Sequence, residues 1–164
     1  MTDRLKKLAA SSPFTVTELH RQFAYDRLLP RVFSAPDAQR WVLKGAAALL
    51  ARLEMARHSK DVDLSWQSTV GLDEAERAFR AVAGRDVGDF FVFAIGIATP
   101  LVGDKGKRFA VVAMLGGRPF AAFSVDLVAG QSMTATPEAV PPLLLRVLDH
   151  FGRGGWRWRE GNAQ

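Results

Sequence analysis

Hydrophobic and polar positions repeat along the chain with helical spacing in some segments and short apolar runs in others. Four segments carry an apolar stripe at helical spacing or are rich in alanine and leucine, and they predict helices at Thr17–Phe33, Ala46–Ala56, Asp73–Ala83 and Leu143–Phe151. Pro30 is expected to kink or end the first helix, because proline lacks the backbone N–H that a helix interior uses. Gly84 follows the third, as helix ends favour.

Short stretches rich in valine, phenylalanine and isoleucine predict strands at Trp41–Lys44, Val62–Trp66, Phe90–Ala98, Lys107–Leu115 and Phe120–Val128. Turn sequences at residues 103–106 and 116–119 indicate that the last three strands form a meander. The aromatic run at residues 90–93 is expected to lie in the sheet core on both of its faces. The pattern predicts an α/β (α+β) fold, with a mixed, mostly antiparallel sheet flanked by helices.

The chain has 164 residues, of which 48% are hydrophobic and 24% charged, which is typical of a globular protein. With no cysteine, disulfides, thiolate zinc sites and cysteine nucleophiles are excluded. We expect one domain over residues 1–151 with its core at 41–130, followed by a basic, tryptophan-containing tail at 152–164. The apolar run at 90–103 is too short to span a membrane, and residues 1–14 hold no export signal. A cytoplasmic protein without a membrane partner is expected.

The charge balance favours an acidic partner. The formal net charge is +5 and the sequence pI is about 10.1, which favours contact with phosphate backbones. In the tail, arginines alternate with Trp156 and Trp158, so this segment could grip phosphates and stack on bases. A tail whose tryptophans fold back onto the core is the alternative interpretation.

Two aspartates, Asp61 and Asp63, stand two residues apart on a predicted strand. Side chains at i and i+2 project from the same face of a strand, so both carboxylates point one way, roughly 6–7 Å apart. They repel each other unless a cation lies between them, and a divalent metal suits two carboxylates together with phosphate oxygens. The alternative is a pair of solvated acids on an edge strand.

The segment that precedes these aspartates suits phosphate binding. Gly45 opens a predicted helix directly after a strand, so backbone N–H groups and the helix dipole face this turn. Arg57, His58, Ser59 and Lys60 add positive charge and a hydroxyl just before the paired acids.

A third acid, Asp126, lies in the apolar strand F-A-A-F-S-V-D-L-V and shares a face with Ser124. A carboxylate in so apolar a strand is costly to bury without a partner. We therefore expect Asp126 to converge with Asp61 and Asp63 on a two-metal site for in-line attack on a phosphate. This expectation requires all three side chains to lie on the same side of the sheet.

The motif order is K-G-x-x-A-L, then R-x-S-x-D-x-D-L, then R-F-x-V-x-x-x-L-G-G-R-x-F-x-x-F-S-V-D. It resembles that of the AbiEii/AbiGii-type nucleotidyltransferase toxins of the DNA polymerase beta-like superfamily, over about residues 42–130. The resemblance implies a nucleotidyltransferase fold, two Mg²⁺ ions and an NTP substrate. It also implies transfer of a nucleotide to RNA, notably tRNA, or to protein, and a cognate antitoxin as partner in a toxin–antitoxin or abortive-infection system.

By this resemblance, Asp61 and Asp63 are the catalytic metal-binding pair and Asp126 is the third catalytic and metal-binding acid. The nucleotide-binding positions are Lys44, Gly45, Ala46, Arg57 and Ser59. Two features depart from the family pattern. Ala46 and Ala47 replace the usual second glycine and hydroxyl residue, and the chain stops soon after residue 151, before the usual C-terminal helical region with a further lysine and aspartate. Lys105 or Lys107 could reach the phosphates in its place.

Three functions follow from these patterns. The first is a nucleotidyltransferase that uses Asp61, Asp63 and Asp126. The second, motivated by the two departures, is a module that keeps the fold and binds a nucleotide, an RNA or a partner protein without turnover. The third is a small-molecule nucleotidyltransferase of the aminoglycoside-modifying kind, which needs an acidic pocket that a net charge of +5 does not favour.

Overall fold

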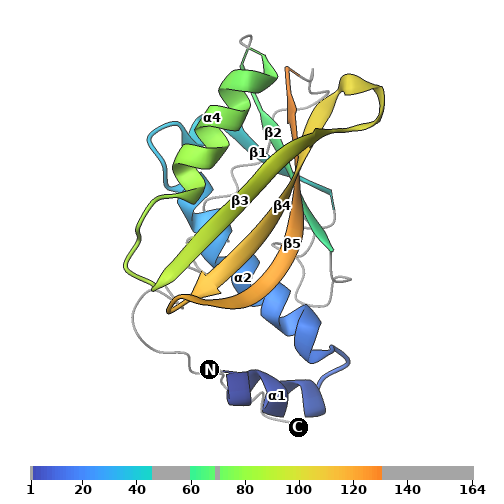
Figure 1. Ribbon diagram of the computed structural model, residues 1–164, viewed down its shortest axis with the longest axis vertical. Coiled ribbons are helices and arrows are strands. Elements are labelled where there is room, and N and C mark those ends of the chain that lie inside the picture. Colours follow the sequence, from blue (N-terminus) through green and yellow to red (C-terminus); the bar gives the residue numbers. More distant parts are fainter. Residues whose placement is uncertain (1, 46–59, 69–70, 131–164) are drawn as a thin grey trace, which may run out of the picture.

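The computed structural model describes residues 2–45, 60–68 and 71–130, which form a five-stranded sheet with helices (Figure 1). The helices are α1 (Thr2–Ala10), α2 (Val16–Phe33) and α4 (Leu72–Ala83), with short 3-10 turns at η1 (Ala38–Arg40) and η2 (Val102–Asp104). The strands are β1 (Trp41–Lys44), β2 (Asp61–Trp66), β3 (Phe91–Pro100), β4 (Gly106–Leu115) and β5 (Arg118–Ala129). Their order is β1-β2-β5-β4-β3, and the β2–β5 pair is parallel while the other neighbours are antiparallel. The mixed, mostly antiparallel α/β class is confirmed.

The expected strands and the helices near 17–33 and 73–83 are present, with their ends shifted by a few residues or less. Pro30 does not end α2, because the helix continues to Phe33 and the Ser34 N–H donates to the Pro30 carbonyl at 2.9 Å. Helix α1 was not expected from the sequence. The expected helices at 46–56 and 143–151 and the tail at 152–164 lie outside the described residues. No helix within 2–45, 60–68 or 71–130 is long and apolar enough to cross a membrane.

A capping box fixes the start of α2. The Thr15 side chain accepts a hydrogen bond from the Glu18 N–H at 3.2 Å, and the Glu18 carboxylate accepts one from the Thr15 N–H at 2.8 Å. Each residue thus satisfies a backbone donor that the first helical turn leaves without an intrahelical partner. From this cap, α2 runs across the sheet and packs against β5 (Figure 1).

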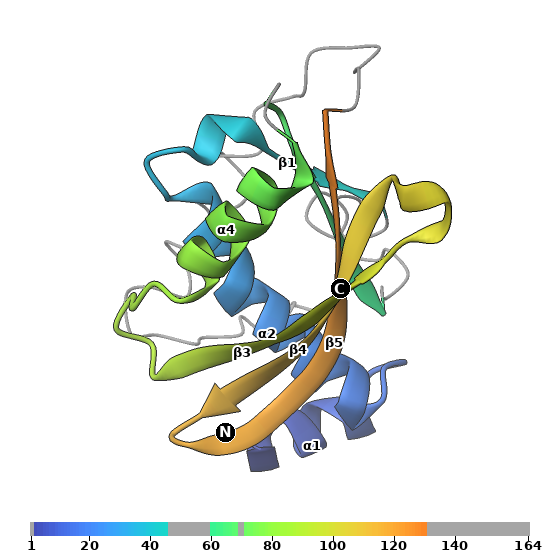
Figure 2. The same ribbon diagram turned by 45° about the horizontal axis from the view of Figure 1, so that its top comes forward.

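Helices α2 and α4 pack on one face of the sheet, and the hydrophobic core lies between (Figures 1 and 2). Edge-to-face contact joins Tyr25 of α2 to Phe123 of β5, with ring centroids 4.9 Å apart. Phe79 of α4 meets Phe109 of β4 at 5.4 Å. Each of these side chains is at most 7% exposed, and burying one aromatic of this size stabilises the fold by about 1.5–3 kcal/mol. One face of every strand is therefore committed to the core.

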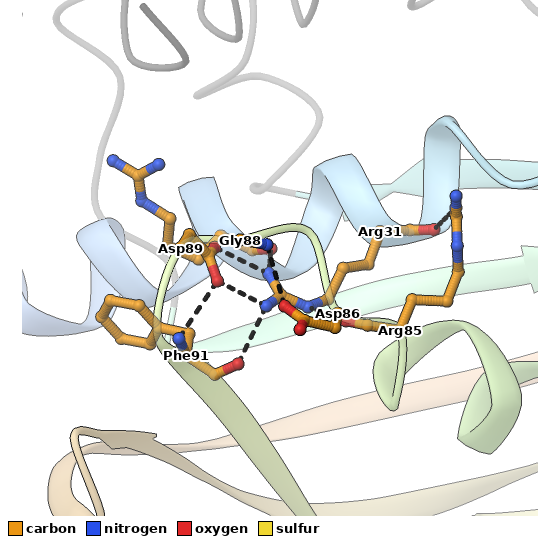
Figure 3. A network of polar contacts seen from close by, with 7 residues as sticks. Arg31, Arg85, Asp86, Gly88, Asp89 and Phe91 are labelled. Atoms are coloured by element: carbon orange, nitrogen blue, oxygen red, sulfur yellow. Dashed lines mark hydrogen bonds and ion pairs between the residues drawn. The ribbon is translucent and has the colours of Figure 1, made fainter. Parts of the chain in front are cut away.

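A buried arginine, Arg31, ties α2 to the loop that leads into β3 (Figure 3). Its side chain is 0% exposed and donates to both carboxylate oxygens of Asp89 at 2.9 and 2.6 Å. It also donates to the backbone carbonyls of Arg85 and Phe91, each at 2.9 Å. Burial acts to raise the pKa of Asp89, but hydrogen bonds from Arg31 and the Phe91 N–H outweigh it, so the pKa is lowered. The ion pair fixes the start of β3 against α2.

The aromatic run at 90–93 is not buried on both faces, so that expectation was wrong. Phe91 and Phe93 point into the core, but Phe90 is 83% exposed and Val92 66% exposed. Phe90 also adopts a positive φ of 62° at the start of the strand. The reason is that α2 and α4 pack on one face of the sheet, so alternate side chains of this run point to the other face, away from the core.

Candidate active site

The two acids of β2, Asp61 and Asp63, lie on the face of the sheet opposite the core. Their neighbours Val62 and Leu64 are 0% and 1% exposed and belong to the core. Because side chains alternate along a strand, burial of these two residues directs both carboxylates to the other face. The expected orientation of the pair follows from packing alone.

Strand β5 brings Asp126 to the same face. In the parallel β2–β5 pair, Asp63 stands opposite Asp126 and Asp61 opposite Ser124. A contact across the strands gives the same result, because Nη2 of Arg108 lies 2.6 Å from an Asp126 carboxylate oxygen and 3.9 Å from one of Asp61. The structure therefore places Asp126, which lies far from Asp61 and Asp63 in the sequence, on the same face as these two acids, as the expected site requires.

Four residues in register form a charged row across four adjacent strands. Lys44 of β1 stands opposite Asp63 of β2, Asp63 opposite Asp126 of β5, and Asp126 opposite Arg108 of β4. The signs run positive, negative, negative, positive across the sheet. Residues directly opposite each other across strands have Cβ atoms roughly 4.5–5.5 Å apart, so each charge acts on its neighbours. We call this set the charged row.

The pKa of Asp63 is raised by its surroundings in the charged row. Burial is the largest cause that raises the pKa of this carboxyl, and the negative charges of Asp61 and Asp126 raise it further. Lys44 and Arg108 act in the opposite direction without cancelling the effect. The carboxylates thus repel one another even with two cations beside them, and an additional cation would relieve that repulsion.

Gly45 lies directly against the Asp63 carboxylate at the end of β1. It has a φ of +63°, in the left-handed region that favours glycine. A Cβ added at this position would overlap Oδ2 of Asp63 and lie 3.0 Å from its Cγ. A side chain at position 45 would therefore displace a carboxylate of the site, which gives Gly45 a role that the sequence did not reveal.

Arg108 is the site residue that sequence reasoning missed. Its Nε and Nη2 atoms donate to the two Asp126 carboxylate oxygens, each at 2.6 Å, in the fork geometry that arginine forms with carboxylates. The expectation for Lys107, one residue earlier, was wrong. Its Nζ lies on the α4 side of the sheet, 2.7 Å from Asp73 and 2.8 Å from Glu76, and so does not face the three acids.

Ala46, Arg57 and Ser59 lie outside the described residues, as does His58. Within the described ranges, no three histidine, aspartate or glutamate side chains are arranged as a ready-made metal site. The donor chemistry nevertheless fits Mg²⁺, which prefers carboxylate oxygens, and the three acids provide these on one face. In the present arrangement both oxygens of one of them, Asp126, are engaged by Arg108.

A family model and several solved structures are similar to this chain. The family model described as nucleotidyl transferase AbiEii toxin, type IV TA system, matches residues 27–152. The fold is similar to MenT4, a nucleotidyltransferase toxin from Mycobacterium tuberculosis H37Rv, with a TM-score of 0.56 and 22% identity over 78% of this chain and 43% of that one. JHP933 from Helicobacter pylori aligns with a TM-score of 0.43 and 16% identity, over 73% of this chain and 47% of that one. No curated protein sequence matches.

The chain thus spans less than half the length of these two solved structures. The family model, by contrast, covers more than half of this chain and includes all three acids of the shared face. The chain belongs to the AbiEii nucleotidyltransferase toxin family.

Proposed function

We propose that this protein transfers a nucleotide from an NTP to RNA, with tRNA as the acceptor, in a Mg²⁺-dependent reaction. The observation that carries the proposal is the placement of Asp61, Asp63 and Asp126 on one face of the β2–β5 pair. Family membership supports nucleotidyl transfer as the class of reaction. The acceptor and the metal are our inference from the chemistry of the site and from the resemblance.

Asp61, Asp63 and Asp126 would hold the divalent cation, with two Mg²⁺ ions as the expected number. When bound, the metal supplies positive charge to the triphosphate and lowers the pKa of the attacking hydroxyl. The protein contributes rigidity, since each carboxylate sits on a strand whose alternate residues are locked in the core. A site on rigid strands costs little reorganisation when charge develops in the transition state.

Lys44 and Gly45 would receive the phosphates. Lys44 lies at the end of the charged row, and Gly45 brings the backbone against Asp63 without an intervening side chain. In the reaction, the acceptor hydroxyl gives its proton to solvent water and its oxygen bonds to the α-phosphorus, while the bond from that phosphorus to the bridging oxygen breaks. Pyrophosphate then leaves with the electron pair of the broken bond. Alignment and charge neutralisation dominate such phosphoryl chemistry.

The test is transfer of label from α-labelled NTPs to total tRNA in the presence of Mg²⁺. Wild type is compared with Asp61→Asn, which keeps the shape of the side chain but removes its charge. Asp3→Asn on the exposed surface of α1 serves as the matched control. We expect wild type and the control to label tRNA equally and Asp61→Asn to lose about a hundredfold or more in rate. Absence of labelling by wild type, or wild-type labelling by Asp61→Asn, would contradict the proposal.

The proposal extends to the organisation and the partners of the protein. We propose a catalytic unit over residues 1–151 with its core at 41–130, and a cognate antitoxin that controls it, as the toxin family implies. The net charge of +5 supports an RNA acceptor, because a basic surface attracts a phosphate backbone. Binding to tRNA should therefore weaken steeply as the salt concentration rises.

A second candidate is a module of the same fold that binds a nucleotide, an RNA or a partner without turnover. The observation that favours it is the engagement of both Asp126 oxygens by Arg108. Calorimetry with NTP and Mg²⁺, combined with an assay of pyrophosphate release, separates the two. Binding with no pyrophosphate in the presence of tRNA supports the module, whereas pyrophosphate release that depends on tRNA supports the enzyme.

A further inference from the structure

Arg108 lies against the acids to which a divalent cation would have to bind, on the face of the sheet that Asp61, Asp63 and Asp126 share. Its guanidinium binds both oxygens of Asp126 at 2.6 Å, and Nη2 is also 3.9 Å from Asp61. The side chain is 47% exposed, so it can leave this position without disturbing the core. Asp126 itself is less exposed, at 15%, and its carboxylate is fixed by the strand.

A cation and the guanidinium compete for this carboxylate. The two N–H donors engage both oxygens, which is the bidentate pairing that arginine makes with carboxylates. A metal ion must coordinate at least one of the same oxygens. A metal ion bound to Asp126 would also lie beside the Arg108 guanidinium, and the two positive charges would repel each other. Metal binding at Asp126 is therefore expected to open the pairing with Arg108.

The surroundings show that the position is specific to Arg108. Its neighbour Lys107 is held on the opposite face of β4 by Asp73 and Glu76 of α4. Lys44 stands opposite Asp63, on the other side of the acids from Arg108 in the sheet order. Arg108 is thus the cation of the charged row that engages Asp126 directly, across the β4–β5 pair.

We propose that Arg108 is the resident counter-cation of the three acids, and that a divalent cation reaches Asp126 by displacing its guanidinium. Arg108 then acts as a positioning residue. It keeps Asp126 oriented and the acids partly neutralised before metal arrives, and it sets how tightly the metal binds. The inference rests on the proposed function, because it assumes that the acids bind a metal.

The experiment is calorimetric titration of the whole chain with Mn²⁺, without nucleotide, for wild type, Arg108→Gln and Arg108→Lys. Loss of the competing guanidinium should lower the Mn²⁺ Kd of Arg108→Gln about two- to fivefold, the range expected when a partly exposed ion pair no longer competes. Arg108→Lys keeps the charge but loses the fork, so its Kd should lie between the two. Lys107→Gln, on the same strand and the opposite face, is the matched control and should bind Mn²⁺ as wild type does.

Thermal unfolding in the presence of EDTA provides a second measurement. Arg108→Gln leaves the acids without their counter-cation, so its melting temperature should fall in EDTA, and Mn²⁺ should raise it by more than it raises that of wild type. Equal or weaker Mn²⁺ binding by Arg108→Gln, while Asp63→Asn abolishes binding, would overturn the inference alone. Absence of Mn²⁺ binding in every variant would overturn both the inference and the metal dependence of the proposed function.

Discussion

Replacement of Gly45 by alanine tests the close contact between the end of β1 and the carboxylate site. The substitution adds one carbon, and that carbon would overlap Oδ2 of Asp63 and lie 3.0 Å from its Cγ. Since Gly45 has a φ of +63°, alanine also brings backbone strain. The Asp63 side chain must move, or the chain around residue 45 must change its conformation.

The two effects can be separated by a matched control. Gly116, in the β4–β5 turn, has a φ of +56°, and a Cβ added there meets nothing within 4 Å. Alanine in the left-handed region costs about 1–2 kcal/mol of stability, so Gly116→Ala and Gly45→Ala should share this loss. Gly45→Ala alone should also displace Asp63, and a misplacement of about 1 Å at a reacting centre can cost about a hundredfold in rate.

The assay measures nucleotidyl transfer to tRNA at a temperature where urea denaturation shows each variant to be fully folded. We expect Gly116→Ala to transfer at close to the wild-type rate and Gly45→Ala at about one hundredth of it or less. If the two variants transfer label equally well, the contact between Gly45 and Asp63 does not matter for the reaction, and the reasoning is refuted.

Three further predictions concern stability. Arg31→Met leaves Asp89 without its buried partner, so the free energy of unfolding should fall by about 3–5 kcal/mol in urea denaturation at pH 7; a loss below 1 kcal/mol would contradict the role of the ion pair. Thr15→Ala removes the capping box with Glu18 and should lower the free energy of unfolding by about 1 kcal/mol in the same assay. An unchanged free energy of unfolding would show that water replaces the cap fully and would contradict this prediction. Burial raises the pKa of Asp26 from 3.8 to about 7, so the stability that its protonated form provides is lost as the pH rises from about 4 through 7. Asp26→Asn should thus match wild type in thermal unfolding at pH 4 and exceed it at pH 8, by up to about 4 kcal/mol; equal stability at pH 8 would refute the shift.

Burial decided most of what the sequence could predict. Alternation in β2 places Val62 and Leu64 in the core and the two aspartates on the other face, and the same parity applies to Val125 and Asp126 in β5. No knowledge of strand order was needed for this, because the hydrophobic effect fixes which face is buried. The common face of the three acids could therefore be predicted, although the roles of these acids remain our proposal.

The pairing of Arg108 with Asp126 could not be predicted, because it depends on a bulge. The turn pairs Leu115 with Arg118, and counting seven residues back along each strand would place Arg108 opposite Val125. A register shift between Ala113 and Met114 moves the pairing by one residue, so that Arg108 meets Asp126. A shift of one residue changes which side chains meet, and no residue pattern near position 113 indicates the bulge.

The pattern of a single segment also does not show which faces of its strand other elements cover. The run at 90–93 has the pattern of a strand buried on both faces, but α2 and α4 pack on one face of the sheet, and Phe90 and Val92 are exposed. Lys107 is a similar case, since nothing local shows that α4 presents Asp73 and Glu76 to it. These features depend on contacts between elements far apart in the chain.

The central claim is that the carboxylates on the shared face act as one unit. Its most direct test is the rate of nucleotidyl transfer by Asp63→Asn, Asp126→Asn and the double variant, measured under one condition with folding verified for each. Residues that act as a unit are strongly non-additive, so each single variant should lose about a hundredfold or more, and the double variant should be little worse than either. Wild-type transfer by Asp126→Asn, or a double loss equal to the product of the two single losses, would contradict the claim.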